Sequence, residues 1–486
     1  MGVFMRLFLG SMCGITWAVV LASVDSRERS EEDAPASTRY RPLLPYYLLP
    51  MFMGMLVVMW AFLGWRQGFE LMLTTLFNVF GYIGIYYLLL CLLLPLARRY
   101  VSARVCAALW LLPNYLYVLT QPAYELPNPV FALWLPDGWI GGLFLVWAAG
   151  FLGVLGWKIV SHFRFRRYIL WSAREVEEAD VLALWEKEQR RAGFGKTPYT
   201  LVRSDRVSTP LTIGFFKRSI RVVLPERDYT PEELRLIFRH ELVHIGREDA
   251  GTKFFLAFCA AMCWFNPLMW WAMRRSAEDL ELSCDETVLL EANDRTRRQY
   301  ADLILTTAGD GRGFTTCLAA GVKSLRYRLR HIVAPRKRAE GALLGGLVFF
   351  LIFMTCGYTA LGYERLSGEE ALFGGRGAEN FTVTVAEWKT DSARGFDACD
   401  IRDEAALRDY LAGLDFYKIT GNYTFMAEEH GLSLRCKQEG VQSVTLVDLT
   451  DRGVIVYRPE SGRLREFRYA CRDVDWAYLE ELLAVE

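Results

Sequence analysis

Six apolar segments, each about as long as a bilayer is thick, constrain the fold of this 486-residue chain more than any other feature. They cover approximately residues 3–24, 43–64, 71–96, 105–120, 140–161 and 343–361. A helix of roughly 20 apolar residues spans the hydrocarbon core of a membrane. The sequence therefore predicts a polytopic α-helical membrane protein, with about five spans in residues 1–161 and a final span at 343–361.

The first and fourth segments each differ from an ordinary membrane span. Arg6 precedes an apolar core, as in a signal peptide, but no small-x-small cleavage site comes before the charged stretch 25–41. We therefore expect the first segment to be a span that is retained. The fourth segment is short and contains Pro113, which disrupts a helix, so it is the least typical of the six.

Arginine and lysine are distributed unevenly over the loops between these segments. Residues 25–42 and 97–104 are rich in arginine, whereas residues 121–139 contain no basic residue. Basic residues also follow the fifth segment and precede the sixth. Because basic loops stay in the cytoplasm, we expect the N-terminus outside the cell membrane, residues 162–342 in the cytoplasm and residues 362–486 outside.

A further apolar stretch, Phe254–Met273, is interrupted by Asn266-Pro267. Proline breaks a helix, and a full crossing would place the residues before and after the stretch on opposite sides of the membrane. Those residues are expected to meet at one metal ion, as argued next. We therefore predict a helical hairpin that lies against or dips into the cytoplasmic face.

One short motif, His240-Glu241-Leu-Val-His244, contains the residue types that suit metal-dependent hydrolysis. Thr230–Glu233 predicts the start of the helix that carries it, with a capping hydroxyl, a proline and a glutamate. His240 and His244 are four residues apart, so both imidazoles project from one face and can bind one Zn²⁺ ion. Glu241 would act as the base for a zinc-bound water. An isolated match to this pattern arises easily by chance, but here it takes two of only 5 histidines.

A catalytic zinc ion usually needs a third protein ligand. Ser276–Glu286 is predicted to form a second helix, on which Glu281 and Asp285 share a face. Glu281 would complete the ligand set, and Asp285 would accept the N–H of a ligand histidine. Glu278 sits on nearly the same face and is a competing ligand. Cys284 points off that face and is expected to pack in the interior, and a solvated helix face is the plain alternative for the carboxylate pair.

Composition excludes some classes of function and leaves the cysteines open. The net charge of +0 offers no general basic surface, so direct nucleic-acid binding is not expected. The 11 cysteines form no C-x-x-C pair. Cys399, Cys436 and Cys471 lie in the C-terminal region, where one pair would form a disulfide if that region is extracytoplasmic.

An ordered set of segments over about residues 40–345 resembles the BlaR/MecR-type antirepressor membrane metallopeptidases, a gluzincin family of Gram-positive bacteria. The segments are Thr209–Gly214, Ser219–Pro225, His240–His244, Trp264–Pro267 and Glu281–Asp285. The resemblance implies that His240, His244 and Glu281 bind zinc, with Glu241 as the base and Asp285 behind the ligands. It also implies that residues 214–225, with Gly214, Ile220 and Val222, form a strand that binds an extended peptide substrate.

The predicted architecture is therefore a polytopic membrane region, a cytoplasmic mainly-α gluzincin zinc-peptidase domain at 162–342 and an extracytoplasmic α+β domain at 362–486. The outer domain contains no S-x-x-K and looks too short for a penicillin-binding sensor. Its expected strands are 381–388, 432–437, 443–449 and 454–458, and its expected helices lie near 404–412 and 475–484.

The implied function is that of a signal transducer, a zinc metalloendopeptidase that cleaves a cytoplasmic repressor or its own chain when an extracellular signal arrives. Residues 307–338 are a candidate region for self-cleavage. The expected partners are a protein or peptide substrate, membrane lipid and a second copy of the chain in a homodimer.

Two alternatives remain at this point. A constitutive quality-control or prenyl-protein zinc peptidase would need no outer domain. A receptor in which zinc only joins two helices would need no Glu241.

Overall fold

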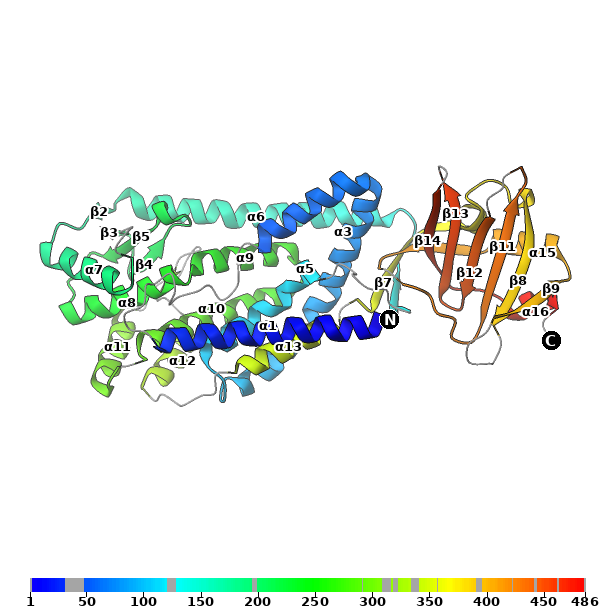
Figure 1. Ribbon diagram of the computed structural model, residues 1–486. Coiled ribbons are helices and arrows are strands. Elements are labelled where there is room, and N and C mark those ends of the chain that lie inside the picture. Colours follow the sequence, from blue (N-terminus) through cyan, green and yellow to red (C-terminus); the bar gives the residue numbers. More distant parts are fainter. Residues whose placement is uncertain are drawn as a thin grey trace.

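The computed structural model describes residues 2–30, 48–119, 128–194, 199–290, 292–307, 316–317, 322–333, 341–355, 357–389, 396–421, 423–440, 444–460 and 463–484. Figure 1 shows an elongated molecule, in which long helices lie between a large sheet at one end and a small sheet with shorter helices at the other. The central helices are α1 (Gly2–Ser30), α3 (Leu48–Ala97), α4 (Ala103–Leu111), η1 (Leu112–Tyr115), α5 (Leu116–Leu119), α6 (Trp139–Trp171) and α13 (Ala342–Thr355).

These helices follow the predicted apolar segments with two differences. α3 runs without a break through the parts of the second and third segments from Leu48 on. Its ribbon nevertheless changes direction part of the way along (Figure 1). The fourth segment is divided into α4, η1 and α5 at Pro113, and the residues of α4 and η1 are buried.

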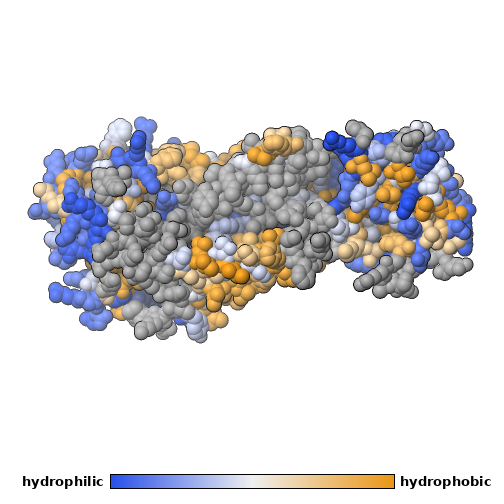
Figure 2. All heavy atoms as spheres, viewed as in Figure 1, coloured by the Kyte–Doolittle hydropathy of each residue, from blue (hydrophilic) through white to orange (hydrophobic). Residues whose placement is uncertain are grey.

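Two helices of the described chain are long and apolar enough to cross a membrane by length and composition, Met72–Ala97 within α3 and Trp139–Trp171. The apolar parts of α1 and α13, Leu7–Ser23 and Ala342–Thr355, are shorter. Figure 2 shows mainly hydrophilic residues at the small-sheet end, a mixture of hydrophilic and hydrophobic residues at the large-sheet end, and hydrophobic residues in the coloured parts of the middle.

α1 and α13 approach each other closely at glycines. A Cβ atom on Gly346 would lie 2.5 Å from the carbonyl oxygen of Gly14, and a Cβ on Gly14 would lie 2.9 Å from the carbonyl oxygen of Gly346. Small residues let two helix backbones approach in this way. The first and last predicted spans are therefore direct neighbours.

The large sheet has ten strands in the order β1-β7-β10-β14-β13-β12-β11-β8-β9-β15. They are β1 (Phe131–Trp134), β7 (Thr359–Ser367), β8 (Phe381–Lys389), β9 (Phe396–Ile401), β10 (Asp415–Ile419), β11 (Gly431–Gln438), β12 (Val444–Thr450), β13 (Gly453–Glu460), β14 (Arg463–Cys471) and β15 (Leu483–Ala484). The helical elements of this domain are α14 (Gly368–Phe373), η3 (Ala378–Asn380), α15 (Glu404–Gly413) and α16 (Trp476–Leu482). The mixed sheet confirms the α+β prediction, and β8, β11, β12, β13, α15 and α16 match predicted elements.

The large sheet begins earlier in the chain than predicted. β1 comes from the loop between the fourth and fifth apolar segments and pairs in parallel with β7, Phe131 opposite Thr359. β7 itself starts soon after α13 ends at Thr355, so the last three residues of the predicted span 343–361 lie in the sheet. The sheet is thus joined to the helices through two separate connections.

The small sheet has the order β2-β3-β5-β4-β6. Its strands are β2 (Arg174–Glu175), β3 (Thr200–Ser204), β4 (Leu211–Ile213), β5 (Arg221–Pro225) and β6 (Thr316–Cys317). The helices around it are α7 (Ala179–Arg191), η2 (Lys217–Ser219), α8 (Pro231–Gly246), α9 (Asp249–Met262), α10 (Pro267–Val288), α11 (Asp294–Thr307) and α12 (Val322–Val333).

The prediction of a single strand over residues 214–225 is wrong. The chain turns at η2, and β4 and β5 pair antiparallel as a hairpin, with Thr212 opposite Val222. Gly214 has φ +126°, and a Cβ there would lie 2.4 Å from the carbonyl oxygen of Ser219, so only glycine fits this tight turn. Val222 lies on an inner strand and is fully buried, so it has no open edge for a substrate.

The stretch Phe254–Met273 forms two helices, as predicted, with α9 and α10 joined by a turn before Pro267. This turn packs against α6. A Cβ on Gly150 would lie 2.2 Å from the indole of Trp264, and the Trp147 indole N–H donates to the carbonyl oxygen of Met262 at 2.9 Å.

The three cysteines of the C-terminal domain are free thiols, and the sheet explains why. Cys399 lies on β9, Cys436 on β11 and Cys471 on β14. β11 lies two positions from β9 and three from β14, and β9 and β14 are five positions apart. At about 4.8 Å between neighbouring strands, these strands are separated by about 10 Å or more. A disulfide requires Cα atoms within about 7 Å.

We therefore expect all three cysteines to be alkylated in the denatured full-length protein without prior reduction. Mass spectrometry of the labelled peptides checks this. A peptide pair that is released only after reduction would contradict the strand order.

Candidate active site

The helix that carries the histidine motif begins as the sequence predicts. Thr230 caps α8 by accepting the backbone N–H of Glu233 at 3.3 Å, and the Glu233 carboxylate accepts the N–H of Thr230 at 2.8 Å. This capping box fixes where the helix starts. The face of α8 that results buries His240, Glu241 and His244, whose exposed fractions are 1%, 0% and 1%.

Three ligand-type atoms converge beside this face. The Nε2 atoms of His240 and His244 lie 3.1 Å apart, and Glu281 Oε2 on α10 lies 3.6 Å from each of them. In the part of the chain that the structure describes, Glu281 Oε2 is buried and accepts no hydrogen bond. Tetrahedral zinc with bonds of about 2.0–2.2 Å holds its ligand atoms about 3.3–3.6 Å apart. The two Glu281 distances lie in this range and the 3.1 Å between the imidazole nitrogens is slightly below it, so the three residues fit a zinc ion after a small outward shift of the rings.

The other ring nitrogen of His244 is held by a carboxylate that directly follows the motif helix. Asp249 Oδ2 lies 2.5 Å from His244 Nδ1, and both side chains are fully buried. Glu248 has a left-handed backbone, with φ 54°, and this turn reverses the chain so that Asp249 faces back toward α8. With Nδ1–H donating to Asp249, the Nε2 lone pair of His244 is directed at the metal position.

His240 is held in a similar way through a tyrosine. The Tyr300 hydroxyl lies 2.8 Å from His240 Nδ1 and donates to Asp285 Oδ1 at 2.8 Å. Arg328 binds Asp285 with two hydrogen bonds of 2.6 Å. Asp285 itself is 3.6 Å from His240 Nδ1, so it acts on this ring through Tyr300 rather than by the direct bond that we expected.

The structure separates the two competing third ligands. Glu278 points elsewhere and pairs with Arg275 at 2.9 Å. Cys284 is fully buried, as expected, but it lies beside the site, because its Sγ is 3.4 Å from His240 Nδ1. His240, His244 and Cys284 together form a group with ligand atoms within 4.8 Å of one another. Cys284 therefore rivals Glu281 as a ligand, although it adjoins the ring nitrogen that Tyr300 also contacts.

Charges around the site favour a bound cation. Burial disfavours the charged form of His240, but Cys284 and Glu281 beside it raise its pKa to about 9. Burial also opposes ionisation of Glu281, yet His244 and Lys253 hold the pKa of its carboxyl well below the usual range. Lys253 Nζ lies 3.4 Å from Glu281 Oε1, the oxygen that faces away from the histidine pair. The site thus keeps its carboxylate ionised and attracts positive charge to the two imidazoles.

Glu241 is oriented by the small sheet. The Thr212 hydroxyl on β4 donates to Glu241 Oε2 at 2.6 Å, and the carboxylate is fully buried. A cavity of about 230 Å³ opens beside Thr212 and His244. It is lined mainly by apolar side chains, with Thr212, Gly214, Phe215, Ile220, His244 and Gly251 among the lining residues. Gly214 and Ile220 therefore adjoin the site, whereas Val222 does not.

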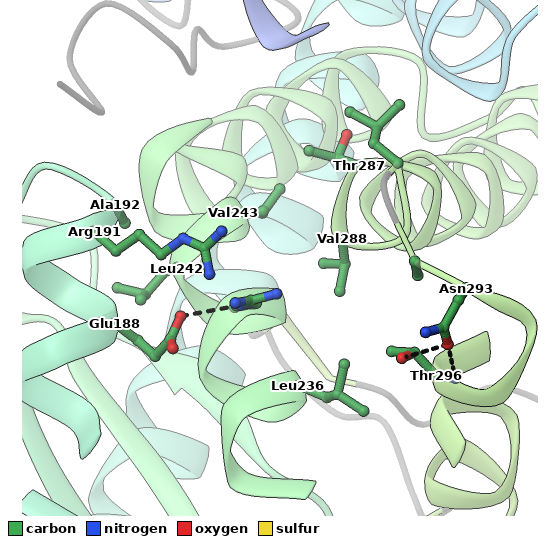
Figure 3. A pocket seen from close by; sticks show the side chains of 13 residues that line it. Glu188, Arg191, Ala192, Leu236, Leu242, Val243, Thr287, Val288, Asn293 and Thr296 are labelled. Carbon is green, nitrogen blue, oxygen red and sulfur yellow. Dashed lines mark hydrogen bonds and ion pairs between the residues drawn. The ribbon is translucent and has the colours of Figure 1, made fainter. Parts of the chain in front are cut away.

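A second cavity, of about 250 Å³, lies behind α8. Figure 3 shows it between α7, α8, α10 and α11, with Arg191 and Glu188 on one wall and Asn293 and Thr296 on the other. Of the proposed site residues, none lines it.

The sequence of this region matches a known peptidase family. Residues 135–332 match the family model described as BlaR1 peptidase M56. The regulatory protein BlaR1 of Bacillus licheniformis is 26% identical over 215 residues, which cover 42% of this chain and 35% of that protein. The match therefore spans about a third of the length of this curated relative. Residues 135–332 form a peptidase M56 domain of the BlaR/MecR type.

Proposed function

We propose that the chain is an integral-membrane zinc metalloendopeptidase that transmits an extracellular signal by cleaving a cytoplasmic repressor or itself. The observation that carries this proposal is the convergence of two imidazole nitrogens and one carboxylate oxygen within 3.6 Å of one another. In this proposal His240, His244 and Glu281 bind zinc. Asp249 and the Tyr300–Asp285 pair hold the two rings in the tautomer that zinc requires.

Zinc bound at these residues would supply the Lewis acidity that peptide-bond hydrolysis needs. Glu241 takes a proton from the attacking water and returns it to the leaving amine. Thr212 positions this carboxylate, because its short hydrogen bond fixes the plane of the Glu241 group.

We expect a peptide substrate to bind along β4, on the side where β6 pairs in this structure. β4 carries Thr212 and pairs with β5 on one side. On its other side it pairs antiparallel with β6, so that Thr212 lies opposite Thr316 of the same chain. An extended peptide that replaces β6 on this side would run past Glu241. Because β6 already occupies the edge, we include the chain's own segment around residues 316–317 among the substrates.

A route for the signal follows from the position of α6. Its first residue comes soon after β1 of the large sheet, and its last turns pack on the small sheet, where Ile169 belongs to the same buried cluster as Leu211 and Ile213 of β4. We propose that α6 and α13 cross the cell membrane, with the peptidase domain in the cytoplasm and the large sheet outside. A change at the outer sheet then reaches the strand that orients Glu241.

Glu241→Gln is expected to retain zinc and lose proteolysis, by roughly 10²–10⁴-fold. The amide keeps the size of the side chain and can still accept from Thr212, but it cannot take a proton. The measurements are zinc content and the fragment pattern of the chain and of cellular proteins. Glu278→Gln, in a residue paired with Arg275, is the matched control and should cleave normally. Normal cleavage by zinc-loaded Glu241→Gln would contradict the proposal.

The third ligand is tested by comparing two variants on α10. Glu281→Gln should weaken zinc binding by more than about 100-fold, beyond the 10–100-fold cost typical of residues behind a ligand. Cys284→Ser should bind zinc within a few fold of the wild type, because its sulfur adjoins Nδ1 rather than Nε2 of His240. Zinc affinity is measured by competition with a chelator. The reverse order of effects would assign the zinc to Cys284 instead.

A further inference from the structure

Two basic side chains meet between α6 and α10, away from the proposed zinc site. The Lys158 ammonium lies 5.1 Å from the ring centre of Trp270 and 5.4 Å from that of Trp157. Arg274 is close enough to interact with Lys158 electrostatically. Arg274 follows Trp270 by four residues, so the two side chains share a face of α10. Lys158 therefore lies beside the indole of Trp270, on the face of α10 that also carries Arg274.

This pair has no acidic partner in the part of the chain that the structure describes. The neighbouring Arg275 differs, because it pairs with Glu278 at 2.9 Å and stacks over Trp271. Two like charges side by side repel each other unless an anion lies between them. Because no described carboxylate lies beside Lys158 and Arg274, we expect an anion from outside the chain to bind between them.

The position of Lys158 along α6 indicates which anion it is. Lys158 comes 19 residues after Trp139, the first residue of this helix. At 1.5 Å per residue this is about 29 Å, close to the thickness of the hydrocarbon core of a bilayer. Trp139 and Trp157 are 60% and 62% exposed, as expected of indoles at the two membrane interfaces. Lys158 would therefore lie at the level of the lipid headgroups on the cytoplasmic side.

We propose that Lys158 and Arg274 bind the phosphate headgroup of an anionic phospholipid, beside the indole of Trp270. This proposal rests on the membrane embedding in the proposed function but not on peptidase activity. The bound lipid would join α6, which reaches β4, to α10, which carries Glu281. Glu281 comes 11 residues after Trp270, about 16 Å further along the helix, so the lipid site and the zinc site are distinct.

The test is native mass spectrometry of the full-length protein in nonionic detergent, titrated with phosphatidylglycerol or phosphatidylcholine. We expect the wild type to bind phosphatidylglycerol more tightly than phosphatidylcholine. The double variant Lys158→Gln, Arg274→Gln should bind it roughly 30-fold more weakly. Each cation near an anionic headgroup strengthens binding by a factor of about 5 to 6, which is about 1 kcal/mol. Arg275→Gln is the matched control and should bind as the wild type does.

Two further arms make the result decisive. The double variant Lys158→Arg, Arg274→Lys keeps both charges and should retain the lipid. If the glutamine variant fails to fold, this charge-conserving variant still tests the proposal. Glycerol phosphate, which has the same charged group without acyl chains, should displace little lipid. Equal binding of both lipids by the wild type, undiminished phosphatidylglycerol on the double variant, or full displacement by glycerol phosphate would overturn the proposal. Zinc content and cleavage, measured on the same samples, report on the proposed function separately.

Discussion

Two imidazole nitrogens held 3.1 Å apart, with a carboxylate oxygen 3.6 Å from each, are the constraint on which the rest of this structure depends. Both rings have their Nδ1 atoms beside buried oxygen partners, so both Nε2 lone pairs face the same point. In a buried site three such electron pairs repel one another unless a cation joins them. The cation in turn requires that α8 and α10 be kept in register, and the surrounding elements do this.

The turns between these helices matter as much as the ligands. α8 starts at a capping box and ends where the left-handed residue Glu248 reverses the chain, and this reversal brings Asp249 to His244. The turn before Pro267 then brings α10 back along α9, and this return places Glu281 beside the histidines. The far end of the hairpin packs against Gly150 of α6. One long helix thus contacts the hairpin, the small sheet and, through the short connection to β1, the large sheet.

The sequence predicts the parts of this site that depend on helical spacing. His240, His244 and Glu281 follow from i, i+4 geometry and from the need for a third ligand, and the structure brings them together. Asp249 and Tyr300 cannot be predicted from helical spacing. The position of Asp249 depends on a reversed turn, and that of Tyr300 depends on a separate helix that packs against α8. In the same way, Thr212 contacts Glu241 only because β4 pairs within the small sheet, and no local sequence pattern predicts that pairing.

Errors in the prediction have the same origin. Apolar and polar residues alternate in part over residues 214–225, which suggests one strand. The turn at η2 instead places these residues in a hairpin and buries Val222 between the neighbouring strands. The outer domain was expected to begin at 362, but strand pairing with β1 and β7 extends its sheet to residues 131 and 359. Cys284 was expected to point off the face that carries Glu281 and Asp285. It lies one residue before Asp285, and its Sγ contacts His240 at Nδ1, the ring nitrogen that faces away from the metal position.

The central claim, a zinc ion held by two histidines and a glutamate, is tested most directly by X-ray absorption spectroscopy of the purified full-length protein with zinc. We predict a first shell of nitrogen and oxygen atoms at about 2.0–2.2 Å, with the multiple-scattering pattern of two imidazoles. A sulfur atom at about 2.3 Å in that shell would assign Cys284 as a ligand and contradict the account.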